Sequence, residues 1–277
     1  MTDMKPAWRL IPYKQYSACE NMAIDEAVLQ ATIKNRKSPT LRFYGWNPAA
    51  VSIGFFQDAE KEVNIEKCRA SGIDIVRRLT GGKAVFHKVE LTYCIAAGDD
   101  DNFFPSDIMG TYKTISDCLV EGLSRLGIKA CLAENGRALA ENQFKACCFS
   151  AASRHELLVE GRKICGSAQK RQKGGFLQHG SLLLDFNPEE SAALMLPPRS
   201  DSELRILINS VTSIKRQTGR SIAPEKICSI MEESFCAILG MTTAEAPLSA
   251  EEIELKNKLI NKYNDMNWNK DKVANIF

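Results

Sequence analysis

The strand-like runs of this 277-residue chain lie in its first two-thirds, with some helical patterns between them, and mainly helical patterns follow after Pro188. The extended runs are short, and residues such as those of Gly45-Trp46-Asn47-Pro48 separate them. A turn at Glu160-Gly161 joins two of the runs, which predicts a two-residue β-hairpin. Strands followed by helices indicate an α+β fold, in which mixed or antiparallel β-sheets are flanked by helices and the C-terminal third is helical.

Capping residues and apolar periodicity locate the predicted helices. A capping box over residues 17–20 begins the first helix, and Gly127 ends another that spans Asp107 to Leu126. Further capping boxes over residues 200–203 and 249–252 introduce helices in the last third of the chain. The strand that opens the chain, Trp8 to Pro12, is predicted to lie at a sheet edge.

Length and composition are those of an ordinary globular protein, with 44% hydrophobic and 25% charged residues. We expect a single domain with its core over residues 8–187 and a helical C-terminal part over residues 188–277. The net charge of +2 lacks the strong positive charge typical of nucleic-acid binding. No apolar run approaches membrane-spanning length, and the N-terminal residues lack the apolar segment of a secretory signal. We therefore expect a cytoplasmic protein that binds neither nucleic acid nor membrane.

Cysteine is frequent, but its spacing does not indicate a metal site. The ten cysteines include no CxxC pair, and the three histidines show no zinc-ligand spacing. Most of the cysteines have apolar neighbours, which is typical of buried thiols in a reducing compartment. Neither a metal nor a disulfide framework is expected.

The segment from Arg77 to His87 reads RRLTGGKAVFH and places paired glycines directly after a predicted strand. Gly81 and Gly82 let the backbone approach a ligand closely, and the N–H groups of such a turn bind an anion or a carbonyl oxygen. Arg77 and Arg78 point to opposite faces of a strand, so at most one of them faces the ligand. The same pattern is common in ordinary turns and does not establish a site by itself.

A second segment, Phe144 to Leu184, places the thiol of Cys148 ahead of the predicted hairpin and Lys163 just after its turn. A thiol becomes a strong nucleophile as the thiolate, which a nearby ammonium stabilises. The hairpin would fold Lys163 back towards the thiol, and this indicates acyl transfer through a thioester. Cys147 projects differently in an extended chain, so only one of the two thiols faces a site. A buried structural thiol and a solvated lysine are the alternative at this point.

Together the two segments resemble the lipoate–protein ligase A and octanoyltransferase superfamily. RRLTGGKAVFH is similar to its glycine-rich signature, and GRKICGSAQKRQ followed by LQHGSLLLD is similar to its second signature. The resemblance runs from about Trp8 to about Asp185. It implies a catalytic domain like those of the biotin and lipoate–protein ligases, with residues 1–277 as one acyltransferase domain.

The resemblance also implies roles for individual residues. Cys148 stands where the octanoyltransferases of Gram-positive bacteria have their nucleophile, and Lys163 matches the lysine that those enzymes place beside it. These two are the expected catalytic residues, and no cofactor is implied. The residues that the resemblance places along the substrate site are Arg78, Gly81, Gly82, Ala84, His87, Gly166, Ser167, Ala168 and His179.

The implied reaction is a step of lipoate biosynthesis and protein lipoylation. Octanoyl would pass from octanoyl-acyl carrier protein to Cys148, and then to a lysine of the glycine-cleavage H protein or of a lipoyl domain of a 2-oxoacid dehydrogenase. One alternative is an amidotransferase that takes octanoyl from the H protein to other lipoyl domains and uses the same cysteine. A second is an ATP-dependent lipoate–protein ligase, which needs no cysteine. A third is a non-catalytic protein that binds lipoyl domains.

Overall fold

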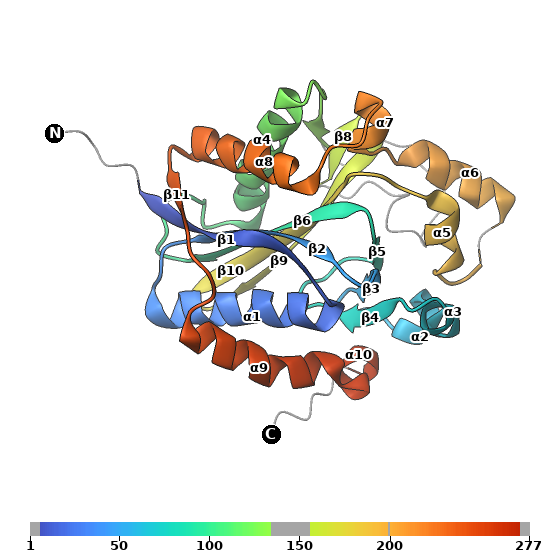
Figure 1. The fold of residues 1–277 in the computed structure, drawn as a ribbon, viewed down its shortest axis with the longest axis horizontal. Coiled ribbons are helices and arrows are strands. Elements are labelled where there is room, and N and C mark those ends of the chain that lie inside the picture. The colour runs from blue at the N-terminus through green and yellow to red at the C-terminus, as the bar shows by residue number, and fades with distance from the viewer. Residues whose placement is uncertain (1–5, 134–155, 199, 272–277) are drawn as a thin grey trace.

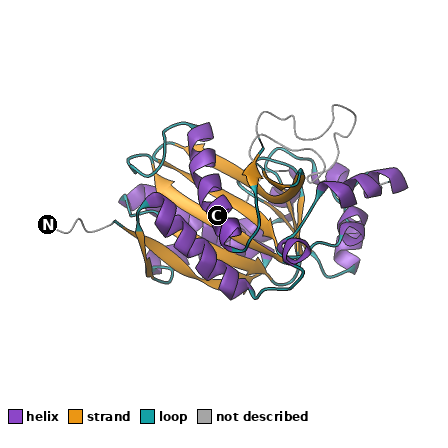
Figure 2. Ribbon diagram, turned by 90° about the horizontal axis from the view of Figure 1, so that it is seen from above, coloured by secondary structure: helices purple, strands orange, loops and turns teal. Residues whose placement is uncertain are grey.

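The computed structural model describes residues 6–133, 156–198 and 200–271. In this part of the chain an eight-stranded sheet carries helices on both faces, and a three-stranded sheet lies next to it (Figure 1). Figure 2, seen from above, shows the helices crossing over the strands. Within the same residues, no helix is long and apolar enough to span a membrane.

The large sheet is mixed. Strand β1 is parallel to both of its neighbours, whereas the other neighbouring strands are antiparallel. This arrangement confirms the predicted α+β class. In order across the sheet, the strands are β11 (Thr242–Glu245), β1 (Ala7–Tyr16), β2 (Thr40–Trp46), β6 (Glu90–Gly98), β10 (Gly175–Leu183), β9 (Arg162–Gln172), β8 (Leu157–Val159) and β7 (Cys131–Leu132).

The small sheet has β3 (Ala50–Ile53) at its centre, parallel to β4 (Asp74–Arg77) and antiparallel to β5 (Val85–His87). A parallel pair requires a crossover, which α2 (Ala59–Glu62) and α3 (Ile65–Ala70) provide. The sheet buries its own apolar cluster, separate from the core of the large sheet.

Alternation along the strands gives the large sheet two apolar faces. On β6, Tyr93 and Ile95 pack in the cluster that includes α4 (Ile108–Arg125) and α8 (Pro224–Leu239). On the opposite face, Cys94 and Ala96 pack against α1 (Ala18–Asn35). Helix α9 (Ala250–Asn264) lies on the outer side of α1, so α1 is enclosed between the sheet and α9 (Figure 1).

Several predicted elements are confirmed. The capping box over residues 17–20 begins α1, and Asp107 caps α4. Glu160 and Gly161 form the hairpin turn between β8 and β9, with φ of 50° and 74°. The predicted edge position of the first strand is wrong, because β11 pairs with its outer side. After Pro188 the described residues thus form this strand as well as helices α5 (Pro188–Ala193), α6 (Asp201–Ser210), α7 (Ile214–Thr218), α8, α9 and α10 (Met266–Asp271).

Candidate active site

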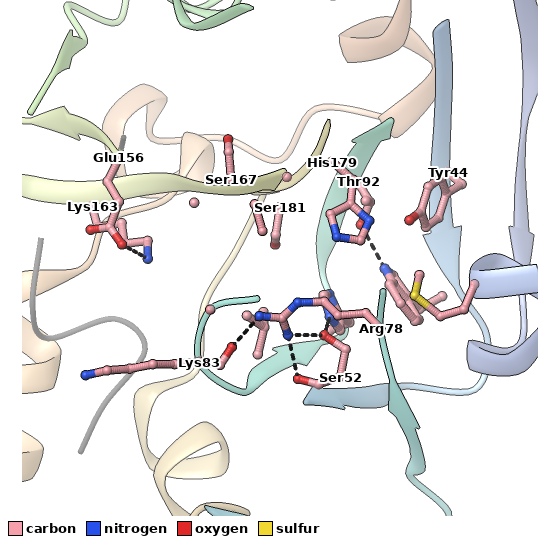
Figure 3. A pocket seen from close by; sticks show the side chains of 18 residues that line it. Tyr44, Ser52, Arg78, Lys83, Thr92, Glu156, Lys163, Ser167, His179 and Ser181 are labelled. Atoms are coloured by element: carbon pink, nitrogen blue, oxygen red, sulfur yellow. Dashed lines mark hydrogen bonds and ion pairs between the residues drawn. The ribbon is translucent and has the colours of Figure 1, made fainter. Parts of the chain in front are cut away.

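A cavity of about 170 Å³ lies between the two sheets, and residues from both sequence signatures line it (Figure 3). One wall is the face of the large sheet that also carries α1, where small side chains leave room. The other wall comes from β3, β5 and the loop that precedes β5. The expected substrate-site residues that line the cavity are Arg78, Gly82, His87, Gly166, Ser167, Ala168 and His179.

Two expected substrate-site residues lie beside the cavity and not on its lining. Ala84 is buried in the apolar cluster of the small sheet, and the carbonyl of Gly81 accepts a hydrogen bond from Arg78. The two neighbouring arginines diverge as the alternation predicts. Arg78 lines the cavity, whereas Arg77 turns away and donates to backbone carbonyls. Cys148, the expected nucleophile, lies outside the described residues.

A β-bulge turns Lys163 into the cavity. Leu158 pairs with Lys163 while Leu157 pairs with Cys165, so β9 contains one extra residue at this point. Strict alternation would place Lys163 on the same face as Cys165, which belongs to the apolar core. The bulge instead brings its side chain over Gly166, where an added Cβ would lie 2.7 Å from Cε of Lys163.

The ammonium of Lys163 forms an ion pair with Glu156, with Nζ and Oε1 2.5 Å apart. Both side chains are buried. Figure 3 shows them pointing toward one another at one side of the cavity. Glu156 comes from the segment just before β8, and the hairpin turn brings it opposite Lys163. A buried charge is retained in a protein when it is paired in this way.

His179 on β10 links the large sheet to α1. Burial lowers the pKa of His179 more than the neighbouring Asp25 raises it, so the imidazole is neutral at pH 7. Burial alone would raise the pKa of Asp25, but the Arg42 guanidinium 2.5 Å away and the hydrogen bond from His179 lower it. Nδ1 of His179 lies 3.4 Å from Oδ2 of Asp25, and Nε2 lies 2.7 Å from Oγ1 of Thr80. Nδ1 therefore carries the proton, and Nε2 accepts from Thr80.

His87 on β5 has the same arrangement on the other wall. Its Nδ1 lies 2.9 Å from Oε1 of Glu90, and its Nε2 lies 2.8 Å from Oγ of Ser52. The ring stacks on Trp46 with centroids 4.0 Å apart, and the indole Nε1 donates to Glu90. Both histidines are thus held between a hydroxyl group and a carboxyl group.

The sequence interpretation missed several polar residues of the site. Asp25, Ser52, Thr80, Glu90 and Glu156 all contact expected residues but were not assigned to the site. Ser181 was missed as well, although it lies two residues beyond His179 on the same strand face. Its hydroxyl is buried on the cavity lining and has no hydrogen-bond partner among the described residues.

The described cysteines stay out of this cavity. None of the eight lines it. Burial raises the pKa of Cys165 to about 12, although Lys163 nearby lowers it, so this thiol stays protonated at neutral pH. Cys147 and Cys148 are outside the described residues. In the part of the chain that the structure describes, no group of three or more His, Cys, Asp or Glu side chains is placed to hold a metal ion.

The lowered pKa of His179 predicts a pH dependence of stability. In the unfolded chain this histidine gains a proton near its ordinary pKa of 6.5, whereas the folded protein does not until lower pH. Below about pH 6.5 the unfolded state therefore binds more protons, and the free energy of unfolding falls by roughly 1 kcal/mol between pH 7.5 and 5.5. Urea denaturation of wild type and His179→Asn at both pH values measures this. Parallel losses in the two proteins would contradict the assignment.

Comparison with known proteins gives one family for most of the chain. Residues 17–236 match the lipoyl protein ligase A/B catalytic domain. Octanoyltransferase LipM of Kyrpidia tusciae is 40% identical over 268 residues, which cover 95% of this chain and 98% of that protein. Octanoyltransferase LipM of Bacillus subtilis is 36% identical over 273 residues, which cover 96% and 98%.

Solved structures support the same fold. A lipoate-protein ligase A bound with ATP superposes with a TM-score of 0.80 at 24% identity, covering 97% of this chain and all 100% of that chain. The bipartite lipoate protein ligase of Thermoplasma acidophilum superposes with a TM-score of 0.79 at 23% identity, covering 98% of each chain. At these identities the likeness concerns the fold and not the reaction.

Proposed function

Because the chain belongs to the lipoyl protein ligase A/B catalytic domain family, we propose that it is an octanoyltransferase of lipoate biosynthesis. The observation that carries the proposal is the similarity of nearly the whole chain to proteins named octanoyltransferase, at 36–40% identity over 95% of its length. The cavity supports it, because residues of both signatures line it together with Lys163.

The proposed reaction has two acyl transfers. The thiolate of Cys148 attacks the thioester carbonyl of octanoyl-acyl carrier protein. The carrier's thiolate leaves and takes a proton from the ammonium of Lys163, while the acyl group stays on the enzyme. The ε-amine of a lysine, on the glycine-cleavage H protein or on a lipoyl domain, then attacks the enzyme thioester. The amide forms, the neutral amine of Lys163 takes the proton that the incoming amine loses, and the thiolate of Cys148 is restored. This two-step transfer needs neither ATP nor a cofactor.

We assign the nucleophile to Cys148 on sequence and by elimination. The eight described cysteines do not line the cavity, which leaves Cys147 and Cys148 as candidates. Cys148 is favoured because it stands where the octanoyltransferases of Gram-positive bacteria have their nucleophile. Lys163 supplies the positive charge that stabilises a thiolate, and it manages the proton of the incoming amine.

The octanoyl chain fits across the strands of the large sheet. The cavity extends from Lys163 on β9 across β10 and β6 to Tyr44 on β2, which is three strand spacings, or about 14 Å. An extended eight-carbon chain spans roughly 8 Å, at about 1.2 Å per bond. Met22 lines the cavity with Tyr44 and Trp46, and this end suits the apolar tail. Each buried methylene contributes about 0.8 kcal/mol.

We propose that the whole chain acts as one catalytic domain. Strand β11 joins the sheet beside β1, and Arg9 of β1 forms a bidentate ion pair with Glu252 of α9. Lys262 of α9 donates to Glu26 of α1 in a buried contact. The C-terminal part therefore contributes to the same core and sheet as the rest.

Intact mass spectrometry tests the function. The protein is incubated with octanoyl-acyl carrier protein without ATP, and then treated with hydroxylamine. We expect a hydroxylamine-labile octanoyl adduct on wild type and Cys147→Ser, but none on Cys148→Ser. Adduct formation from the octanoylated H protein alone would indicate the amidotransferase. Modification of the H protein only with ATP and free octanoate would indicate a ligase, and neither adduct nor transfer would leave a binding protein.

The contact between Gly166 and Lys163 gives a prediction on activity. A methyl group at residue 166 would lie 2.8 Å from Nζ of Lys163, so in Gly166→Ala the flexible lysine moves and the backbone stays. We expect kcat to fall about 10- to 100-fold, because displacements of about 1 Å cost this much. Steady-state kinetics measure the loss, and urea denaturation should show a free energy of unfolding within about 1 kcal/mol of wild type. Unchanged kcat would mean that the transfer tolerates a displaced ammonium.

A further inference from the structure

Arg78 is held by the protein along every edge of its guanidinium. Nε donates to Oγ1 of Thr80 at 3.2 Å, and Nη1 donates to the carbonyl and the hydroxyl of Ser52 at 3.0 and 3.1 Å. Nη2 donates to the carbonyls of Gly81 and Lys83, both at 2.8 Å. A guanidinium has five N–H groups, and these contacts engage all three nitrogens. Arg78 therefore holds the loop at 81–83 instead of presenting free donors to a substrate.

Two matching relays lead away from this arginine. In the first, the hydroxyl of Thr80 accepts from Arg78 and donates to Nε2 of His179, whose Nδ1 donates to Asp25. In the second, the hydroxyl of Ser52 accepts from Arg78 and lies 2.8 Å from Nε2 of His87, as Figure 3 shows in part. Nδ1 of His87 in turn contacts Glu90. Each relay is a hydroxyl, an imidazole and a carboxyl group in that order.

In the relay through His179, the direction of each hydrogen bond is fixed. A hydroxyl has one proton, so Thr80 donates to His179 only if Nε2 carries none. With the proton on Nδ1, the oxygen of Thr80 turns a lone pair to Arg78. On the other side of the cavity, the hydroxyl oxygen of Ser52 also accepts a hydrogen bond from the guanidinium of Arg78. Two walls of the cavity, one from each sheet, thus orient one side chain.

The orientation of Arg78 determines which groups of the loop face the cavity. In a trans peptide the C=O and N–H point in opposite directions. The carbonyl of Gly81 binds Arg78, so the N–H of Gly82, in the same peptide, points away from it. Gly82 has φ of 92°, and a Cβ there would lie 2.8 Å from Nη2 of Arg78. Only glycine suits both the conformation and this close approach.

We propose that Arg78 is a positioning residue, held by the Thr80–His179–Asp25 and Ser52–His87–Glu90 relays, that fixes the loop so that the N–H of Gly82 meets the acyl carbonyl oxygen. The identity of that carbonyl rests on the proposed function. Donors placed in advance of the reaction stabilise the oxyanion that forms when the thioester is attacked. His179 acts here as a neutral hydrogen-bond relay, and His87 holds the hydroxyl of Ser52 in the same way.

Variants that remove the hydroxyl groups of Thr80 and Ser52 test the proposal. Thr80→Val and Ser52→Ala each remove one relay hydroxyl, the double variant removes both, and Thr80→Ser restores a hydroxyl at residue 80. We expect each single variant to lower kcat about tenfold with KM little changed, and the double variant to lower it about a thousandfold, more than the product of the two. Thr80→Ser should recover most of the loss.

Hydrogen exchange read by mass spectrometry on residues 80–84 gives a second readout that needs no substrate. Exchange of the loop amides should be faster in Thr80→Val and fastest in the double variant, and close to wild type in Thr80→Ser. If wild type transfers no octanoyl, the proposed function fails while the exchange data still decide the positioning role. Lower kcat without faster loop exchange would overturn the proposal, and so would a Thr80→Ser variant as impaired as Thr80→Val.

Discussion

Replacing Lys163 with methionine is expected to lower kcat for octanoyl transfer by about a thousandfold, within the range of acid–base and charge effects at active sites. Its ammonium is buried at the end of the cavity that also holds Gly166 and Ser181. Without Lys163 the proposed nucleophile stays largely a thiol and the leaving carrier thiolate lacks its proton donor. The neutral amine that would then accept the proton of the incoming lysine is also missing. Both half-reactions should slow, which single-turnover measurement of adduct formation and of its discharge to the H protein would separate.

Because Lys163 is paired with Glu156, replacing Lys163 also lowers stability, and a second substitution at Glu156 provides the control. Removing Lys163 alone leaves a buried carboxyl group without the ammonium 2.5 Å away, and breaking such a pair costs about 3–5 kcal/mol of stability. In the double variant Lys163→Met/Glu156→Gln the charge is removed from both partners. We expect its free energy of unfolding to recover most of that loss while kcat stays low. Recovery of kcat together with stability would show that Lys163 serves the fold and not the transfer.

Alternation along strands was the most productive signal for the site. It correctly separated Arg78 from Arg77, and it places His179 and Ser181 on one face of β10. It fails at Lys163, because the bulge against Leu157 and Leu158 reverses the face. A one-residue bulge leaves no mark in a hydrophobicity pattern, so the place of this lysine after the hairpin turn and the family resemblance, and not the periodicity, pointed to it.

The sequence patterns did not predict the carboxyl groups of the site, for a different reason. Asp25 lies 154 residues before His179 in the chain and meets it only when α1 packs on the sheet. Glu90 contacts His87 three residues away, but across the start of a new strand. Such contacts depend on tertiary packing, which local patterns do not encode. Strand β11 was missed because it has only four residues, which are mostly exposed and show no apolar alternation.

Replacing Arg77 with methionine should lower the free energy of unfolding by about 4 kcal/mol, because it leaves buried carbonyl groups without donors. Arg77 is fully buried, and its guanidinium joins the loop after β3 to the last turn of α10. Only the planar guanidinium of arginine presents five N–H donors that can bond to both segments at once. The single ammonium of a lysine could not replace it. The six carbonyls that accept from it belong to Gly54, Phe55, Gln57, Trp268, Asn269 and Lys270.

A matched control comes from the same two parts of the fold. Lys270 of α10 forms an ion pair with Glu60 of α2 at the surface, with both side chains about half exposed. Lys270→Met should therefore cost less than about 1 kcal/mol. Arg77→Met should also lower kcat, because Arg77 donates to the carbonyl of Gly54 and Gly54 packs closely on Gly82. A Cβ added at Gly54 would lie 1.9 Å from the carbonyl oxygen of Gly82. A shift of the Gly54 loop thus reaches the cavity. Urea denaturation measures the loss of stability and steady-state kinetics measure the loss of kcat. Equal stability of Arg77→Met and Lys270→Met would show that Arg77 does not hold the two segments together.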